Sequence, residues 1–500
     1  MLVRGNGLRG ESVGQRQALI IALASGALWL GCREAPGSTE LDHDISADDM
    51  RARVSFLASD QLLGRATPSR GLDIAADYVR SELVRFGLEA PRGGYLQRYR
   101  MAMSDRGGGW SLAVRRGSRR STLRYGEDFW GVPWAAGTVE GRARYVGSQP
   151  SQRAVEDDET VWIAHLDLGV MPREWLAAAS ASGAVGLVFV VDDDLGPYVS
   201  DWQEEQESVY DLGDVEPHVP AVLVSEEALD AAIERLDIGT TVASADVANS
   251  GARVELSADL SVQTLTAPNV VAVLPGSDPD LGDEYVLVSA HMDGLGGGPA
   301  IDGDSIYNGA DDNASGTSAL LEVAEAMSAL QEGPRRSVIF LAVSGEEIGL
   351  LGSTWFVAHS PVPLDRIVAN INIDMVGRNW HDTIAVVGKQ YSTLGATIDS
   401  VTLAHPELNM TAVGDQWPAE GFFFRSDHYN FARKGIPSVF FFNGTHEDYH
   451  RPSDEADRIE YGKAARISRL IFEVALALAN ADERPRWDAA ARSRIVEPGR

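Results

Sequence analysis

Four short apolar runs in the second half of the chain are each followed closely by histidine or acidic residues. The runs have strand length and cover Tyr285–Ala290, Ser337–Val343, Ile367–Ile373 and Ser438–Phe442. An amphipathic helical pattern, Ser315–Leu330, lies between the first two runs. Strands that alternate with helices are typical of an α/β sheet layered by helices. Ligands bind outside the carboxyl ends of strands in such sheets, so we expect the polar residues after the runs to share one site.

Length and charge limit the architecture and the partners. The 500 residues are too many for one average core, so we expect a large domain with at least one smaller one. The 73 acidic and 43 basic residues give a formal net charge of -30. This charge repels phosphate backbones and anionic membranes, so we expect no nucleic-acid partner. Nothing in the sequence indicates an oligomeric state.

The N-terminus has the pattern of an export signal. Several arginines precede an apolar run, Ala18–Leu30, that is too short to span a bilayer as a stable helix. The single cysteine, Cys32, follows Gly31, where bacterial lipoprotein signals place the acylated residue, although Trp29 stands where leucine is usual. We therefore expect export as a cell-envelope lipoprotein, with a lipid on Cys32 as its membrane link. The alternative is a secreted periplasmic or extracellular protein.

Changes in the hydrophobic pattern along the sequence predict the domain organisation of the chain. The stretch Ser46–Leu88 has helical spacing, whereas Thr160–Ala164 and Val185–Val191 are short β-rich runs on either side of a helical piece, Arg173–Ser182. The predicted parts are a signal peptide (1–32), a linker (33–45), a main domain in two pieces (46–125 and 258–481), an inserted domain (126–257) and a polar tail (482–500).

The first apolar run leads into Ser-Ala-His-Met-Asp, residues 289–293. His291 can bind a metal through one ring nitrogen while Asp293 accepts a hydrogen bond from the other. A carboxylate partner of this kind fixes the tautomer of the imidazole and raises its basicity. We therefore predict His291 as a metal ligand and Asp293 as a catalytic residue that supports it.

A loop of small and acidic residues, Asn308–Gly316, opens the amphipathic helix. A carboxylate held there can reach two cations at once. Two metal ions roughly 3.5 to 4 Å apart need a shared ligand to offset their repulsion. We predict Asp312 as this bridge and its neighbour Asp311 as a loop or cap residue.

Two further strand ends carry carboxylates. Glu346 and Glu347 are adjacent and would repel each other unless a cation or a proton intervenes. We predict Glu347 as a metal ligand and Glu346 as the general base that takes a proton from an activated water and passes it to the leaving amine. Asp374 is a lone acid in an otherwise apolar stretch, where an unpaired charge is costly, so it is also a predicted ligand.

The last ligand is expected to be a histidine of the C-terminal region, which offers His428, His446 and His450. His450 stands in the loop after the final apolar run and is our prediction. His428 is the main alternative; otherwise it would line the substrate pocket or pack in the core.

Five motifs, in this order and at these separations, resemble those of the bacterial di-zinc aminopeptidases, a family related to glutamate carboxypeptidase, glutaminyl cyclase and the transferrin receptor. The motifs are His-x-Asp, Asp-Asn-Ala-Ser-Gly, Gly-Glu-Glu, Asn-Ile-Asp-Met and Tyr-His-x-Pro-x-Asp. The resemblance covers roughly residues 46–480. It implies a zinc-exopeptidase three-layer α/β sandwich with a mixed central sheet, which holds two Zn²⁺ ions.

The resemblance also implies roles for single residues. Tyr449 is expected to be catalytic by donating a hydrogen bond to the oxyanion, and the peptide bond between Asp312 and Asn313 is expected to be cis. The two implied zinc sites share Asp312; their further ligands are His291 and Asp374 in one, and Glu347 and His450 in the other.

The inserted region resembles a β-rich protease-associated domain, which in relatives lies beside the active site and limits substrate access. It contains a second His-x-Asp motif, residues 165–167. No bridging-acid loop and no Glu-Glu pair follow at the right distance, so we interpret this motif as unrelated to the metal site.

The predicted function is hydrolysis of the N-terminal peptide bond of peptides with a free N-terminus. A carboxypeptidase or dipeptidase on the same scaffold is the first alternative; it needs cations for a terminal carboxylate, and Arg378 and Arg425 lie near motif residues. A glutaminyl cyclase-like acyltransferase with one zinc and a metal-free receptor-like domain are disfavoured by the full ligand set. The aromatic stretches Gly421–Phe424 and Phe440–Phe442 favour large apolar N-terminal residues. Manganese or cobalt could replace zinc at such ligands.

Overall fold

The computed structural model describes residues 44–106, 109–132, 135–148, 159–166, 172–192, 208–213, 219–238 and 250–498. The predicted signal peptide and Cys32 lie outside these ranges. Within them, no helix combines the length and the apolar character needed to cross a membrane.

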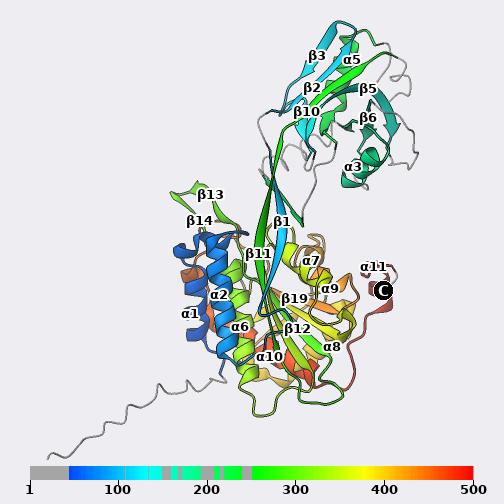
Figure 1. The fold of residues 1–500 in the computed structure, drawn as a ribbon. Helices are drawn as coiled ribbons and strands as arrows, with labels where there is room; N and C mark the ends of the chain where they lie inside the picture. Colours follow the sequence, from blue (N-terminus) through cyan, green and yellow to red (C-terminus); the bar gives the residue numbers. More distant parts are fainter. Residues whose placement is uncertain are drawn as a thin grey trace, which may run out of the picture. The chain divides into compact units, whose positions relative to one another are not determined.

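A nine-stranded mixed sheet, with the order β18-β17-β19-β16-β12-β15-β11-β1-β8, carries the predicted apolar runs (Figure 1). Its four central strands, β19, β16, β12 and β15, run parallel to one another, so their carboxyl ends share one edge. The strands are β1 (Leu96–Arg106), β8 (Ser208–Leu212), β11 (Leu260–Leu274), β12 (Tyr285–His291), β15 (Ser337–Val343), β16 (Ile367–Ile373), β17 (Thr383–Val387), β18 (Thr411–Val413) and β19 (Ser438–Phe442).

Helices cover both faces of this sheet, which confirms the three-layer α/β arrangement (Figure 1). Alternate residues of β15 face opposite sides: Phe340 packs in the core with the helices of one face, and Leu341 packs with Phe356 and Phe431 of the other. On the first face lie α1 (Ala47–Leu57), α2 (Arg70–Arg85), α6 (Gly316–Ser328), α8 (Leu394–Ala404) and α10 (Tyr461–Asn480); on the second lie α7 (Leu351–Ala358) and α9 (His428–Ala432).

The N-terminal helical stretch is broken into separate elements. Ser46 caps α1 by accepting a hydrogen bond from the backbone N–H of Asp49, and Ser69 caps α2 in the same way from Leu72. A short 3₁₀ segment, η1 (Asp60–Arg65), lies between them. The helical spacing of the sequence did not predict this break.

A second, eight-stranded sheet has the order β3-β2-β10-β5-β6-β7-β9-β4, and its four strands β5, β6, β7 and β9 are parallel. Its sequence starts at Ser111, earlier than the predicted boundary at 126, because β2 pairs with β10. Conversely, β8 falls within the predicted insert but pairs with β1 of the first sheet. The elements are β2 (Ser111–Arg116), β3 (Arg119–Leu123), β4 (Phe129–Gly131), β5 (Gly137–Gly147), β6 (Thr160–His165), α3 (Pro172–Ala181), β7 (Gly186–Val191), β9 (Ala221–Ser225), α5 (Glu226–Glu234) and β10 (Arg253–Ala258).

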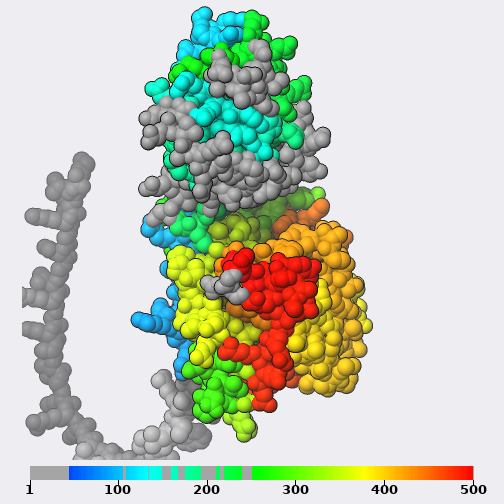
Figure 2. All heavy atoms as spheres, turned by 90° about the vertical axis from the view of Figure 1, so that its right-hand side faces the viewer, coloured from blue at the N-terminus to red at the C-terminus, as the bar shows by residue number. Residues whose placement is uncertain are grey.

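The C-terminal stretch, expected to be a polar tail, contains a helix, α11 (Ala489–Ile495), that packs on the main domain. Ala491 and Ile495 are buried with aromatic residues such as Phe423, and the indole N–H of Trp487 donates to the carbonyl of Gly435. Figure 2 shows this C-terminal part, in red, at the surface next to an orange region that comes from earlier in the chain. A few apolar side chains are therefore enough to fix a mostly polar segment.

Candidate metal centre

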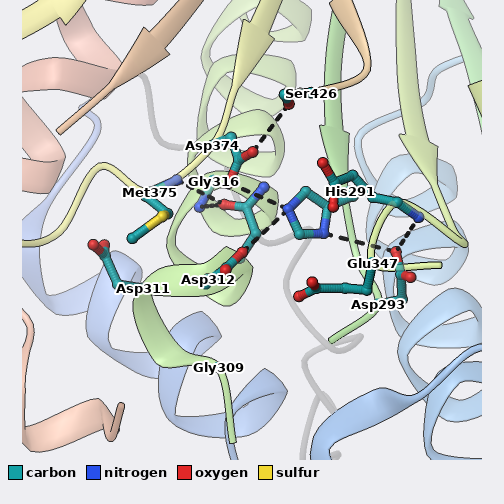
Figure 3. A network of polar contacts seen from close by, with 12 residues as sticks. His291, Asp293, Gly309, Asp311, Asp312, Gly316, Glu347, Asp374, Met375 and Ser426 are labelled. Carbon is teal, nitrogen blue, oxygen red and sulfur yellow. Dashed lines mark hydrogen bonds and ion pairs between the residues drawn. The ribbon is translucent and has the colours of Figure 1, made fainter. Parts of the chain in front are cut away.

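The five predicted metal ligands come together at the carboxyl edge of the parallel strands. Figure 3 shows His291, Asp312, Glu347 and Asp374 at this edge. His291 ends β12, Asp374 directly follows β16, and Glu347 lies just after β15. The residues form two groups that share Asp312: His291, Asp312 and Asp374 in one, and Asp312, Glu347 and His450 in the other.

The distances within each group suit one divalent ion. His291 Nε2 lies 3.3 Å from Asp312 Oδ1 and 3.2 Å from Asp374 Oδ1. His450 Nε2 lies 3.4 Å from Asp312 Oδ2 and 3.5 Å from Glu347 Oε2. Two atoms that each lie about 2.1 Å from a tetrahedral ion are roughly 3.4 Å apart. The two oxygens of Asp312 thus face different histidines, as a bridging carboxylate requires.

The charges of the cluster also fit bound cations. Burial and the neighbouring carboxylates raise the pKa values of Glu346 and Glu347 well above their ordinary range. Burial alone would raise the pKa of Asp312, but its contacts with His291 and His450 lower it below the ordinary value. Glu347 Oε1 is buried without a hydrogen-bond partner. Imidazole and carboxylate ligands with excess negative charge are a donor set that zinc accepts.

The loop of Asp312 is tied to the strand end that carries Asp374. Asp312 lies in η3 (Ala310–Ser315), a distorted helical turn before α6, and its peptide bond to Asn313 is cis, as the resemblance implied. The Asn313 side-chain oxygen accepts hydrogen bonds from the backbone N–H groups of Gly316 and Met375. Because Met375 follows Asp374 directly, these bonds hold the two ligand segments together.

Asp311 is directed away from His291 (Figure 3). Its Oδ1 accepts hydrogen bonds from the backbone N–H of Gly377 at 2.6 Å and from the Ser315 hydroxyl at 3.1 Å. His446 Nε2 lies 3.3 Å from Asp311 Oδ2, so this histidine pairs with the loop residue and joins neither ligand group.

Asp293 lies behind His291, but at a greater distance than the predicted hydrogen bond. Its Oδ1 is 3.7 Å from His291 Nδ1, an ion-pair separation. Its Oδ2 instead accepts hydrogen bonds from the backbone N–H of Gly345 at 2.8 Å and from the Thr67 hydroxyl at 3.0 Å. Asp293 therefore also fixes the start of the segment that carries Glu346.

Asp454, which is not among the residues predicted for the site, supports the Asp312 loop from the C-terminal side. Its buried carboxylate accepts hydrogen bonds from the backbone N–H groups of Asp311 and Asp312, each at 3.0 Å. It is the final residue of the Tyr-His-x-Pro-x-Asp motif, so the motif itself was the signal that could have identified it.

Arg65 supports the same region from the N-terminal segment and was also missed. Its side chain is buried, and its guanidinium donates to the carbonyl oxygens of Leu57, Met292, Asn308 and Gly309. It thereby links the residue after His291 to the loop before Asp312. No sequence pattern marks this arginine, because its partners are backbone groups far away in the chain.

A cavity of about 330 Å³ opens next to the ligands. Glu346 and Tyr449 line it, and the Tyr449 ring stacks on that of His450 with a centroid distance of 3.8 Å. The rest of the wall is largely aromatic, with one basic side chain, and includes Phe422, Phe424, Arg425, Phe440 and Phe442.

The residues that the sequence offered as alternatives, His428, Arg378 and Arg425, have other surroundings. His428 is fully buried between the rings of Phe423 and Phe440, and burial lowers its pKa to about 3, so it is a neutral core histidine. Arg378 forms an ion pair of 2.7 Å with Asp448, whereas Arg425 is exposed with its guanidinium over the Phe422 ring.

The family model described as Peptidase family M28 matches residues 269–475, a range that contains both ligand groups and Glu346. We call residues 269–475 the M28 segment, after the family model that they match. The M28 segment begins within β11 and ends within α10, so it includes the four parallel strands that carry the site.

Curated relatives of this chain include Aminopeptidase YwaD of Bacillus subtilis, 27% identical over 237 residues, which are 44% of this chain and 47% of that protein. Aminopeptidase NAALADL1 of mouse is 35% identical over 132 residues, 25% of this chain and 16% of that protein. The chain thus spans about half or less of the length of these relatives. Among solved structures, the aminopeptidase from Aneurinibacillus sp. strain AM-1 shares the fold with a TM-score of 0.56 and 18% identity, over 90% of this chain and 97% of that one.

Proposed function

We propose that this chain is a two-zinc aminopeptidase that releases the N-terminal residue of peptides. The observation that carries the proposal is the orientation of Asp312, whose two carboxylate oxygens lie 3.3 Å from His291 Nε2 and 3.4 Å from His450 Nε2. The match of residues 269–475 to the model of Peptidase family M28 and the relatives named aminopeptidases support the same reaction class.

In this proposal each zinc ion has its own ligands and a share of Asp312. When bound, the two ions supply Lewis acidity, which polarises a peptide carbonyl and makes a water molecule more acidic. The residues that would hold them are His291, Asp312 and Asp374 for one, and Asp312, Glu347 and His450 for the other. A glutaminyl cyclase-like acyltransferase with one zinc leaves the second group unexplained.

Glu346 is the proposed general base. It lines the cavity next to Glu347 but belongs to neither ligand group, so its carboxylate can take a proton from the attacking water and return it to the leaving amine. Tyr449 lines the same cavity, and its hydroxyl is proposed to donate a hydrogen bond to the oxyanion of the tetrahedral intermediate.

The side chains that line the cavity indicate which end of a peptide substrate binds there. Acidic side chains at the ligand end suit a free ammonium group, and the aromatic wall suits a large apolar first residue. Arg425 is the observation that favours a carboxypeptidase or dipeptidase, because a guanidinium on the same wall can pair with a terminal carboxylate. Export through residues 1–32 and a lipid on Cys32 stay predictions.

The proposal is tested with leucine p-nitroanilide, its N-acetylated form and an N-blocked dipeptide with a free carboxyl terminus. We expect hydrolysis of the free amine alone, lost on chelation and restored by zinc. Hydrolysis of the blocked dipeptide alone would instead establish a carboxypeptidase.

A variant tests the assignment of the base. Glu346→Gln should keep both zinc ions, counted by mass spectrometry, and lose at least about 100-fold in kcat, the lower range for removal of a general base. Glu420→Gln, which changes an exposed glutamate, is the control and should behave as the parent protein. Near-parental turnover in zinc-loaded Glu346→Gln would show that another group is the base.

A further inference from the structure

Three side chains with metal-binding atoms gather at one edge of the eight-stranded sheet. The strands β6, β7 and β9 are neighbours and run parallel, so their carboxyl ends lie together. His165 is the last residue of β6, Asp192 directly follows β7, and Glu226 directly follows β9. Carboxyl ends of parallel strands are where ligands of α/β sheets bind, as they are in the M28 segment.

The geometry of these side chains resembles that of the two ligand groups. One candidate ligand atom from each of His165, Asp192 and Glu226 lies within 4.8 Å of the others. His165 Nε2 is 3.7 Å from Glu226 Oε1, too long for a hydrogen bond but close to the roughly 3.4 Å between two ligands of one tetrahedral ion.

The other ring nitrogen of His165 has a separate partner. Tyr145 lies on β5, the next strand of the sheet, and its hydroxyl is 3.2 Å from His165 Nδ1. A partner on one nitrogen fixes the ring orientation, which is how proteins present the second nitrogen to a metal. Here the second nitrogen, Nε2, is the one that lies 3.7 Å from Glu226 Oε1.

The charge balance favours a cation over a simple ion pair. Among the described residues, neither Asp192 nor Glu226 forms a salt bridge with a lysine or an arginine. Two carboxylates this close repel each other, and a single imidazolium would offset one charge at most. The His165 and Glu226 side chains are 20% and 38% exposed, so water can complete the coordination of an ion.

We propose that the eight-stranded sheet holds a divalent transition-metal ion, such as Zn²⁺, on His165, Asp192 and Glu226. The imidazole favours zinc, manganese or cobalt over calcium and magnesium, which prefer oxygen ligands alone. The ion would join the ends of three strands. This site shares no residue with the proposed zinc pair, so it does not rest on the proposed aminopeptidase function.

The proposed site includes the histidine of the second His-x-Asp motif. From the sequence alone, residues 165–167 are predicted to be unrelated to the metal site, because no bridging-acid loop follows. Asp167 lies outside the described residues, but the carboxylates beside His165 come from later strand ends, 27 and 61 positions further along the chain. Spacing along the sequence could not show this.

The test counts zinc ions per chain in the purified full-length protein by mass spectrometry, after equilibration with zinc and dialysis. His165→Ala and Glu226→Gln should each lower the count by one, whatever number the M28 segment binds. Because only the difference is used, the result is independent of the proposed aminopeptidase activity. Glu226→Gln keeps the shape of a partly exposed side chain and so covers the case in which His165→Ala does not fold.

His405→Ala is the matched control, because His405 also lies between two carboxylates: Nδ1 is 2.9 Å from Glu407 and Nε2 is 3.5 Å from Glu473. Its zinc count should equal that of the parent protein. An unchanged count in Glu226→Gln, or an equal fall in His405→Ala, would overturn the proposal.

Discussion

The backbone N–H of Gly345 donates a hydrogen bond of 2.8 Å to the carboxylate of Asp293. This bond joins the segments that follow β12 and β15, the strands that lead to His291 and to the Glu346–Glu347 pair. One carboxylate therefore orients residues on two adjacent strand ends. Hydrogen bonds from supporting residues of this kind orient metal ligands.

Asp293→Asn should weaken zinc binding. The amide loses the negative charge behind His291, and its NH₂ group cannot accept a hydrogen bond. Loss of such a supporting carboxylate typically costs about 10- to 100-fold in metal affinity. Competition with a chromogenic chelator measures the affinity. Asp77→Asn, an exposed aspartate paired only with Arg80, is the control. An affinity for zinc within twofold of the parent value would contradict a supporting role for Asp293.

Gly309→Ala should disturb the Asp312 loop. Gly309 has a φ of +57°, and a Cβ there would lie 2.1 Å from the carbonyl oxygen of Asp312, so the backbone would have to shift. Gly117→Ala is a matched control, with a φ of +59° and open space around the Cβ position.

Both glycine variants carry the cost of about 1 kcal/mol for a left-handed alanine. Only Gly309→Ala should also lose zinc, as counted by mass spectrometry, and aminopeptidase turnover. Equal zinc content in the two variants would mean that the loop tolerates the shift.

Arg65→Met should be strongly destabilising. It would leave the carbonyl groups of Leu57, Met292, Asn308 and Gly309 without their buried donor. Unsatisfied buried groups cost about 1 to 3 kcal/mol each, so with four such groups we expect a loss of at least about 4 kcal/mol in the free energy of unfolding. Urea denaturation measures it. Arg65→Lys should recover only part of the loss, because an ammonium lacks the planar fork of a guanidinium. A loss below about 1 kcal/mol for Arg65→Met would contradict the argument.

Glu322 should make stability depend on pH. It contacts the buried Arg53 at 2.6 Å, and Arg53 also pairs with Glu82 and Glu325. Burial, which outweighs the attraction of Arg53, raises the pKa of Glu322 to about 7. Arg85 also contacts Glu82 and Glu325, whereas Glu322 has the most buried side chain of the three carboxylates, so Glu322 is the acid that keeps its proton.

The raised pKa of Glu322 sets the direction in which stability changes with pH. The folded state holds a proton on Glu322 that the unfolded state releases near pH 4.5, so stability falls as the pH rises from about 4.5 to about 7 and is constant above. The full loss is on the order of 3 kcal/mol. Glu322→Gln should lack this pH-dependent loss. Its free energy of unfolding, measured by thermal or urea unfolding, should therefore increase relative to that of the parent protein as the pH rises. A difference that does not change between pH 5 and pH 8 would contradict the assignment.

The sequence determined the strands of the main sheet and the residues at their ends. Ile367–Ile373 and Ser337–Val343 are strands with the predicted bounds, because strands buried on both faces are continuous apolar runs that local composition reveals. Asp312 and Glu347 could be singled out for a similar reason: acidic side chains next to buried strands need a partner, and the chain shows them without any knowledge of the fold.

Tertiary structure decided what depends on contacts between distant segments. His428 and His450 look alike in sequence, and only the packing of His428 between Phe423 and Phe440 made it a core residue. The start of the second sheet at Ser111 depended on the pairing of β2 with β10. The partners of Arg65 are backbone carbonyls, which no pattern of side chains in the sequence predicts. Local sequence sets which segments become strands and helices; the meeting of their ends is set by sheet order and long-range packing, which a linear pattern does not contain.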